Sequence, residues 1–226
     1  MAVEIFSLRL GINTCYVIRD RGAIMIDSGP PKKGNAIKNL LSRLGIPPAD
    51  IRLIVLTHGH FDHAGSVKDV KSLTGAKIAI HEEDRPDIEN SRYRFPQGVT
   101  TWGRLTRALL EPIIRSRVTI PAVKADIVLN NNEFSLQEYG INGHIIYTPG
   151  HTAGSVSVVL DSGEAFVGCM AHNGFPFRLR PGLPIYSDDI ERVKESWKLI
   201  LQRGARMIYP GHGKPFPVDV VKKFLH

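Results

Sequence analysis

Cysteine is scarce in this chain, which has only Cys15 and Cys169 among its 226 residues. Two thiols cannot build the disulfide framework of a small secreted scaffold, so Cys15 is interpreted as a small buried strand residue. Long apolar runs are absent, and the first residues lack a basic stretch followed by an apolar one. We therefore expect a cytoplasmic protein with no membrane span and no export signal.

No linker-like segment divides the sequence either. Hydrophobic residues make up 42% of the chain, which is enough to bury one substantial core or two small ones. We therefore expect residues 1–226 to form a single domain.

Acidic residues are fewer than basic ones, with 22 Asp and Glu against 29 Lys and Arg, so the formal net charge is +7. This balance favours anionic partners but does not indicate a fold. Six arginines are concentrated in one segment: Arg92, Arg94, Arg104, Arg107, Arg115 and Arg117. Because basic and aromatic residues do not alternate there, nucleic acid is not expected as a partner. We interpret these arginines as a solvated face of the protein or as a rim that attracts small anionic substrates.

Histidine, in contrast, is concentrated in residues 57–65, directly after an apolar run at 53–56 that is typical of a buried strand. His58, His60, Asp62 and His63 lie within six residues. Neutral imidazole and carboxylate oxygen suit zinc or a similar divalent ion. A polar turn that merely caps the next helix is the simpler interpretation, but it gives no reason to concentrate this side chain. The segment therefore predicts a metal site.

Two later segments repeat one motif. Pro149-Gly150-His151 and Pro210-Gly211-His212 each follow a short apolar run that is typical of a strand. The repetition suggests two related halves, each of which delivers a histidine from a strand end.

With these motifs in this order, the chain resembles the metallo-β-lactamase superfamily of hydrolases. The resemblance covers His58-x-His60-x-Asp62-His63, then His151, then His212, and it runs from about Ile5 to the C-terminus. It implies an α/β (α+β) fold with four αββα layers, in which two mixed β-sheets are flanked by helices. Strand-rich halves that are each closed by helices agree with this architecture.

The resemblance also implies two sets of metal ligands: His58, His60 and His151 for one ion, and Asp62, His63 and His212 for the other. Three protein ligands and an open position describe a catalytic zinc site. We expect two Zn²⁺ ions per chain, with iron or manganese as alternatives. A hydroxide that bridges them would attack a carbonyl-type bond. Asp62 is the candidate catalytic residue, which would orient that hydroxide or protonate the leaving group.

Cys169 departs from the common pattern, since many members with two metals have a bridging aspartate at its position. A cysteine there resembles a branch of the β-lactamases in which cysteine binds the second zinc. That branch usually lacks a histidine at the place of His63. We expect the Cys169 thiolate to be a metal ligand, and a small buried thiol beside a weakened second site is the alternative.

Three further residues are candidates for roles around the metals. His172, three residues after Cys169, is a candidate for substrate contact. Tyr186 stands where some resembling lactonases place a phenol that polarises a carbonyl, and simple packing is the alternative. Asp27 is expected to brace a ligand histidine.

Hydrophobic spacing and turn residues predict the elements on either side of a less regular middle. In the first part, we expect strands at 4–8, 13–19, 23–27 and 53–56, and helices at 33–44 and 64–73. In the second part, we expect strands at 133–136, 144–147, 155–160, 164–168 and 206–209, and helices at 188–202 and 218–225.

The middle segment, residues 82–127, is predicted to be a helical insertion that acts as a lid. Trp102, Leu105, Leu109 and Ile113 keep a helical spacing. Pro112 would cost roughly 3 kcal/mol inside an unbroken helix, so we expect a kink or two pieces there. The alternatives are packing against the sheet, a helix at a membrane surface, and a helix that binds a partner or forms a homodimer.

Together these features predict a metal-dependent hydrolase of a small substrate with a thioester, lactone or ester bond. Hydrolysis of β-lactams is an alternative, which Cys169 favours and His63 disfavours. A metal-binding protein that lost its chemistry with the bridging aspartate is the other alternative.

Overall fold

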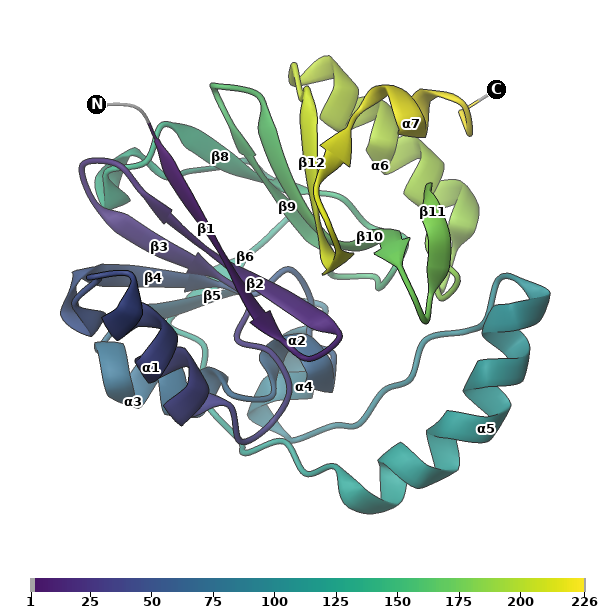
Figure 1. Cartoon of the computed structure of the whole chain (residues 1–226), viewed down its shortest axis with the longest axis horizontal. Helices are drawn as coiled ribbons and strands as arrows, with labels where there is room; N and C mark the ends of the chain where they lie inside the picture. The colour runs from purple at the N-terminus through teal and green to yellow at the C-terminus, as the bar shows by residue number, and fades with distance from the viewer. Residues whose placement is uncertain (1–2, 226) are drawn as a thin grey trace.

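The computed structural model describes residues 3–225, and Figure 1 shows two β-sheets stacked face to face with helices on their outer faces. The extent of the predicted single domain, 1–226, goes beyond these residues and stays a prediction. The predicted αββα architecture is confirmed. None of the helices in the described part of the chain is long and apolar enough to span a bilayer.

The first half of the chain forms a six-stranded sheet with the order β1-β2-β3-β4-β5-β6. Its first three strands are an antiparallel meander, and β3 to β6 run parallel. The strands are β1 (Glu4–Leu10), β2 (Asn13–Arg19), β3 (Ala23–Ile26), β4 (Ile51–Val55), β5 (Lys77–His81) and β6 (Ile127–Leu129). The helices between them are α1 (Gly34–Arg43), α2 (Phe61–Ala64), α3 (Val67–Thr74), α4 (Arg85–Glu89) and α5 (Thr101–Arg117).

The second half forms the other sheet, with the order β13-β12-β10-β9-β8-β7 and β11 paired to β10. Its strands are β7 (Phe134–Ser135), β8 (Gly143–Tyr147), β9 (Val156–Leu160), β10 (Glu164–Gly174), β11 (Arg178–Gly182), β12 (Met207–Gly213) and β13 (Phe216–Pro217). The long helix α6 (Ile190–Gln202) and the short helix α7 (Asp219–Lys222) cover its outer face.

Side chains alternate along the strands and so supply two cores at once. On β2, Tyr16 and Ile18 pack between the sheets, whereas Cys15 and Val17 pack under α1 and α3. A third core lies between the second sheet and α6, around the fully buried Trp197. The period of two in a strand explains this division, because neighbouring side chains point to opposite faces.

Several predicted boundaries were wrong where distant pairing decides them. β10 continues beyond residue 168 to Gly174 because it pairs in parallel with β12, where His172 lies opposite His212. β12 itself extends to Gly213, and the last helix is shorter than predicted. The short strands β5, β6 and β11 were not predicted.

The break into two pieces expected as one outcome at Pro112 is wrong, because α5 is one continuous helix with Pro112 inside it. Proline has no N–H to donate to the carbonyl of Ala108, four residues earlier. Both Ala108 and Pro112 are exposed, so water can reach that carbonyl. The helix therefore continues without leaving a buried unpaired group.

Candidate metal centre

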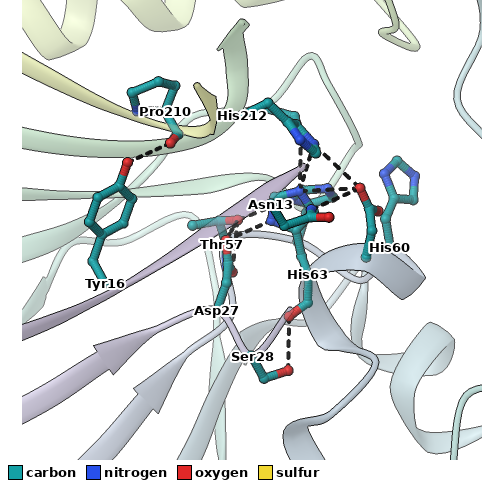
Figure 2. Close-up of polar contacts among 12 residues, drawn as sticks. Asn13, Tyr16, Asp27, Ser28, Thr57, His60, His63, Pro210 and His212 are labelled. Carbon is teal, nitrogen blue, oxygen red and sulfur yellow. Dashed lines mark hydrogen bonds and ion pairs between the residues drawn. The ribbon is translucent and has the colours of Figure 1, made fainter. Parts of the chain in front are cut away.

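The predicted ligands come from loops and strand ends that meet at one edge of the two sheets. His58 and His60 follow β4, Asp62 and His63 lie on α2, and His151 follows β8. Cys169 and His212 lie on β10 and β12. Figure 2 shows the His63 and His212 rings turned toward one another, above Asp27 and Thr57.

One set of side chains combines His58, His60 and His151. Nε2 of His151 lies 3.1 Å from Nδ1 of His60. Nε2 of His58 is buried with no hydrogen-bond partner. The nearest ligand atoms of His58, His151 and Cys169 lie within 4.8 Å of one another.

The other set combines Asp62, His63 and His212. Nε2 of His63 lies 3.3 Å from Nε2 of His212 and 3.1 Å from Sγ of Cys169. Oδ2 of Asp62 lies 3.3 Å from the same His212 nitrogen. Cys169 therefore lies within reach of both sets, since His63, Cys169 and His212 also have ligand atoms within 4.8 Å of one another.

Hydrogen bonds on the far side of the rings decide which nitrogen faces the centre. Nδ1 of His63 lies 2.7 Å from Oδ2 of Asp27, as expected of Asp27. Nδ1 of His151 and Nδ1 of His212 donate to the carbonyls of Tyr186 and Ile12, at 2.9 and 3.0 Å. These partners place the proton on Nδ1 and leave the lone pair of Nε2 directed inward.

His58 is fixed by a relay of the same kind. Its Nδ1 lies 3.0 Å from Oγ1 of Thr57, whose hydroxyl donates to the Asp27 carboxylate. One buried carboxylate therefore orients a histidine of each set. Asp27 itself has a φ of 59°, in the left-handed region that a non-glycine residue seldom occupies.

The strand that carries His212 approaches His63 very closely. A Cβ on Gly211 would lie 2.5 Å from Cε1 of His63, so glycine is required there. The hydroxyl of Tyr16, on β2, donates to the carbonyl of Pro210 at 2.7 Å and ties β12 to the first sheet (Figure 2).

The charges at the centre are strongly coupled. Although burial opposes it, the Cys169 and Asp62 anions raise the pKa of His212 to about 9. The pKa of His63 is also raised: burial opposes the shift, and the Cys169, Asp27 and Asp62 anions outweigh it. Although burial opposes this too, the facing histidines hold the pKa of Cys169 and that of Asp62 well below their usual ranges. The centre therefore stabilises the anionic forms of Cys169 and Asp62, and these anions stabilise a positive charge that lies between them.

This donor set fits a metal ion. Nε2 of His63 and Nε2 of His212 lie 3.3 Å apart with their lone pairs directed inward, and two such nitrogens repel unless a proton or a cation lies between them. Imidazole, thiolate and carboxylate are the ligands that zinc takes in proteins.

Comparison with known proteins agrees with the fold and the motifs. The family model described as the metallo-beta-lactamase superfamily matches residues 8–212. The chain belongs to the metallo-β-lactamase superfamily. It is 30% identical to the Beta-lactamase-like protein 2 homolog of Drosophila melanogaster, over 96% of this chain and 64% of the fly protein. A probable metallo-hydrolase of Methanocaldococcus jannaschii is 29% identical, over 88% of this chain and 86% of that protein.

Among solved structures, the B3 metallo-β-lactamase BLEG-1 superposes with a TM-score of 0.72 at 22% identity. The match covers 98% of this chain and 99% of that structure. At this identity the similarity shows the shared fold and nothing about the substrate.

Sequence reasoning missed Asp84, a fully buried residue of this superfamily member. Its carboxylate accepts hydrogen bonds from the backbone of Gly59 at 3.0 Å and of Gly154 at 3.2 Å, and from the hydroxyl of Thr152 at 2.7 Å. It therefore joins the loop of His58 and His60 to the loop of His151. One acidic residue in the run Glu82-Glu83-Asp84 carries no signal of this role, because the partners lie far away in the sequence.

A pocket opens above the metal centre, and its walls are mostly apolar. Besides the candidate ligands, its lining includes Ile12, Phe61, Phe95, Leu110, Ile114 and Phe177. Arg94 is the arginine of the basic segment that lines this pocket, and its guanidinium lies 3.6 Å from the buried carboxylate of Asp87.

Both residues predicted to contact substrate line the pocket. Nδ1 of His172 lies 3.4 Å from the backbone N–H of Ile185, and its Nε2 is buried without a partner. The Tyr186 hydroxyl is hydrogen-bonded to Thr106 of α5. Of the predicted metal ligands and substrate contacts, all but His58 and His63 line this pocket, and those two have ligand atoms within 4.8 Å of Cys169.

Proposed function

We propose that the protein is a metal-dependent hydrolase that cleaves an ester, thioester or lactone bond of a small substrate. The observation that carries this proposal is the pair of ligand sets that share Cys169 beneath an apolar pocket. Ligand pockets of this kind combine apolar walls with a few convergent polar groups.

The metal ligands would be the predicted ones, with Cys169 between the two sets: His58, His60 and His151 on one side, and Asp62, His63 and His212 on the other. Two zinc ions, with iron or manganese as alternatives, would supply a water of lowered pKa and a positive charge for the carbonyl oxygen.

Asp62 is better suited to orient the attacking water than to protonate the leaving group. The His63 and His212 charges outweigh burial and hold its pKa well below the usual range. A carboxylate with so low a pKa is a poor proton donor near neutral pH. Asn13 donates to its Oδ2 at 3.1 Å and fixes its orientation.

His172 would donate a hydrogen bond to the substrate. Burial lowers its pKa to about 4, so the ring is neutral at pH 7. Since Nδ1 accepts from Ile185, the proton resides on Nε2, the atom without a protein partner. A neutral N–H that lines the pocket can stabilise a carbonyl oxygen as negative charge develops on it.

Tyr186 is assigned a positioning role and does not polarise the substrate carbonyl. Its backbone carbonyl oxygen orients His151, and its side-chain hydroxyl is hydrogen-bonded to Thr106. The residue therefore joins the metal centre to α5. Arg94 remains the candidate for attracting an anionic substrate, although Asp87 offsets part of its charge.

The proposal is tested by elemental analysis of protein purified without added metal, followed by turnover assays after metal loading. The substrates are short thioesters, lactones, cephalosporins and phosphodiesters. A metal-dependent rate on thioesters, esters or lactones would support the proposal. A rate on cephalosporins alone would favour the β-lactam alternative. Bound metal with no carbonyl hydrolysis would favour a metal-binding protein without this chemistry.

A further inference from the structure

Large apolar side chains are exposed on three segments that also supply apolar residues to the pocket lining. Four of them are Ile12 (54%), Leu109 (62%), Ile113 (50%) and Phe175 (84%). They come from the β1–β2 turn, from α5 and from the β10–β11 connection, which are far apart in the sequence. We call Ile12, Trp102, Leu109, Leu110, Ile113 and Phe175 the apolar rim.

The apolar rim is continuous with the walls of the pocket. Ile12 and Leu110 belong to both, since each lines the pocket and is more than two-fifths exposed. Phe177 lines the pocket two residues after Phe175. An apolar path therefore leads from the metal centre to the surface.

α5 is held firmly beside this path at its first turns. A Cβ on Gly103 would lie 2.2 Å from the carbonyl oxygen of Ile185, so only glycine allows this approach. Thr106 binds the Tyr186 hydroxyl, and the Trp102 indole donates to the carbonyl of Pro176 at 3.0 Å. Figure 1 shows the rest of α5 extending beyond the two sheets.

Two neighbouring faces of α5 are apolar. Leu110 and Ile114 line the pocket, whereas Leu109 and Ile113 are exposed beside them. Because residues four apart stack on one face of a helix, each pair forms a short apolar stripe. An exposed apolar surface of this kind marks a site that another apolar group covers.

We propose that the acyl chain of the substrate covers the apolar rim, so that the enzyme prefers long, linear acyl esters or thioesters. The inference rests on the proposed function. With the scissile carbonyl at the metal centre, the acyl chain would pass Phe177 and Leu110 and leave between Ile12 and α5. Continuity with the pocket favours this occupant, because a second copy or a membrane would cover the rim without entering the pocket.

The test measures kcat/KM on acetyl, butanoyl, hexanoyl, octanoyl and decanoyl thioesters of one small thiol. With metal-loaded protein, we expect kcat/KM to rise by up to about fourfold for each methylene that enters the path. Titration calorimetry with butanoate and decanoate gives a second readout that needs no turnover. The decanoate is expected to bind more tightly.

Two rim variants and one control locate the effect. Ile12→Ser and Phe175→Ser change exposed side chains, so folding should not be affected. Their kcat/KM is expected to fall more as the acyl chain becomes longer. Val128→Ser changes a side chain of β6 that is 45% exposed and lies outside the apolar rim. It is expected to keep the whole chain-length profile.

The outcomes separate this inference from the proposed function. Hydrolysis at a rate independent of acyl length, with equal binding of both carboxylates, would overturn the inference and leave the proposed function intact. No carbonyl hydrolysis, together with tighter binding of decanoate that Phe175→Ser weakens, would support the apolar path and refute the proposed function. Light scattering that shows a dimer dissociated by Phe175→Ser, with an unchanged chain-length profile, would assign the rim to a second copy.

Discussion

Two buried carboxylates hold the two sides of the candidate metal centre in different ways. Asp27 accepts hydrogen bonds from side chains: it meets the His63 ring directly and reaches His58 through Thr57. Asp84 acts mainly on the backbone, where it accepts from Gly59 and Gly154. The same residue type thus sets ring orientation and charge at one place and loop shape at the other. Substitution of Asp27 or of Asp84 tests the two roles separately. Substitution of Cys169, which lies where the two ligand sets meet, tests both sets at once.

Cys169 should give the largest effect, because it lies within reach of both ligand sets. Cys169→Ser is expected to reduce the bound metal from two ions to at most one and kcat/KM by more than about 100-fold, since even removing an outer partner of a ligand costs 10- to 100-fold. Elemental analysis and turnover measure the two effects. Cys15→Ala is the matched control for a buried thiol and should keep its metal. Full metal content in Cys169→Ser would show that the thiol is a packing residue.

Asp84 should matter most for stability. Asp84→Ala leaves the backbone N–H groups of Gly59 and Gly154 buried without an acceptor, which is expected to lower the free energy of unfolding by about 3 kcal/mol. Urea unfolding of metal-free protein measures this loss. Asp84→Asn keeps an acceptor oxygen and should lose less than half as much. Equal stability of the two variants would contradict the assigned role.

Asp27 should matter more for metal affinity than for loop shape. Asp27→Asn removes the charge that faces His63 and is expected to weaken binding of the ion held by His63 and His212 by about 10- to 100-fold. Competition with a chromogenic chelator measures each affinity. Asp219→Asn, at the exposed start of α7, is the control. Equal weakening of both ions would mean that Asp27 acts on the whole centre through Thr57 rather than on His63.

Asp87 gives an effect that appears only as a dependence of stability on pH. Burial, with Asp84 nearby and Arg94 opposing, raises the pKa of Asp87 from 3.8 to about 6. Between these values the unfolded chain releases the proton while the folded protein keeps it, so the free energy of unfolding falls as the pH rises through this window. Asp87→Asn should flatten the fall, as measured by urea unfolding of metal-free protein. Identical pH profiles of the two proteins would refute this assignment.

Local patterns in the sequence carried much of the site. The spacing of His58, His60, Asp62 and His63 was readable because α2 and the loop before it present four ligands within one short segment. His151, Cys169 and His212 were predicted through the resemblance to the superfamily. Asp27 was predicted with them, and its contact with His63 is confirmed.

Other residues were beyond this kind of prediction. Asp84 lies in an acidic run with no periodic signal, and its importance comes from the loops of Gly59 and Thr152 that fold onto it. The length of β10 was underestimated because β12, which pairs with it, lies more than thirty residues later. Of the apolar rim, the sequence indicated only Trp102, Leu109 and Ile113, as part of a helical spacing.

The sequence by itself determined the metal-binding chemistry, the membership of a hydrolase superfamily and the alternation that builds two stacked sheets. These properties depend on side-chain type and short spacing, which a linear pattern preserves. Only the tertiary structure decided which nitrogen of each histidine faces the centre, that Cys169 lies within reach of both ligand sets, and that α5 and Ile12 border one apolar opening. Those features depend on contacts between segments far apart in the chain, and such contacts exist only once the two sheets have packed together.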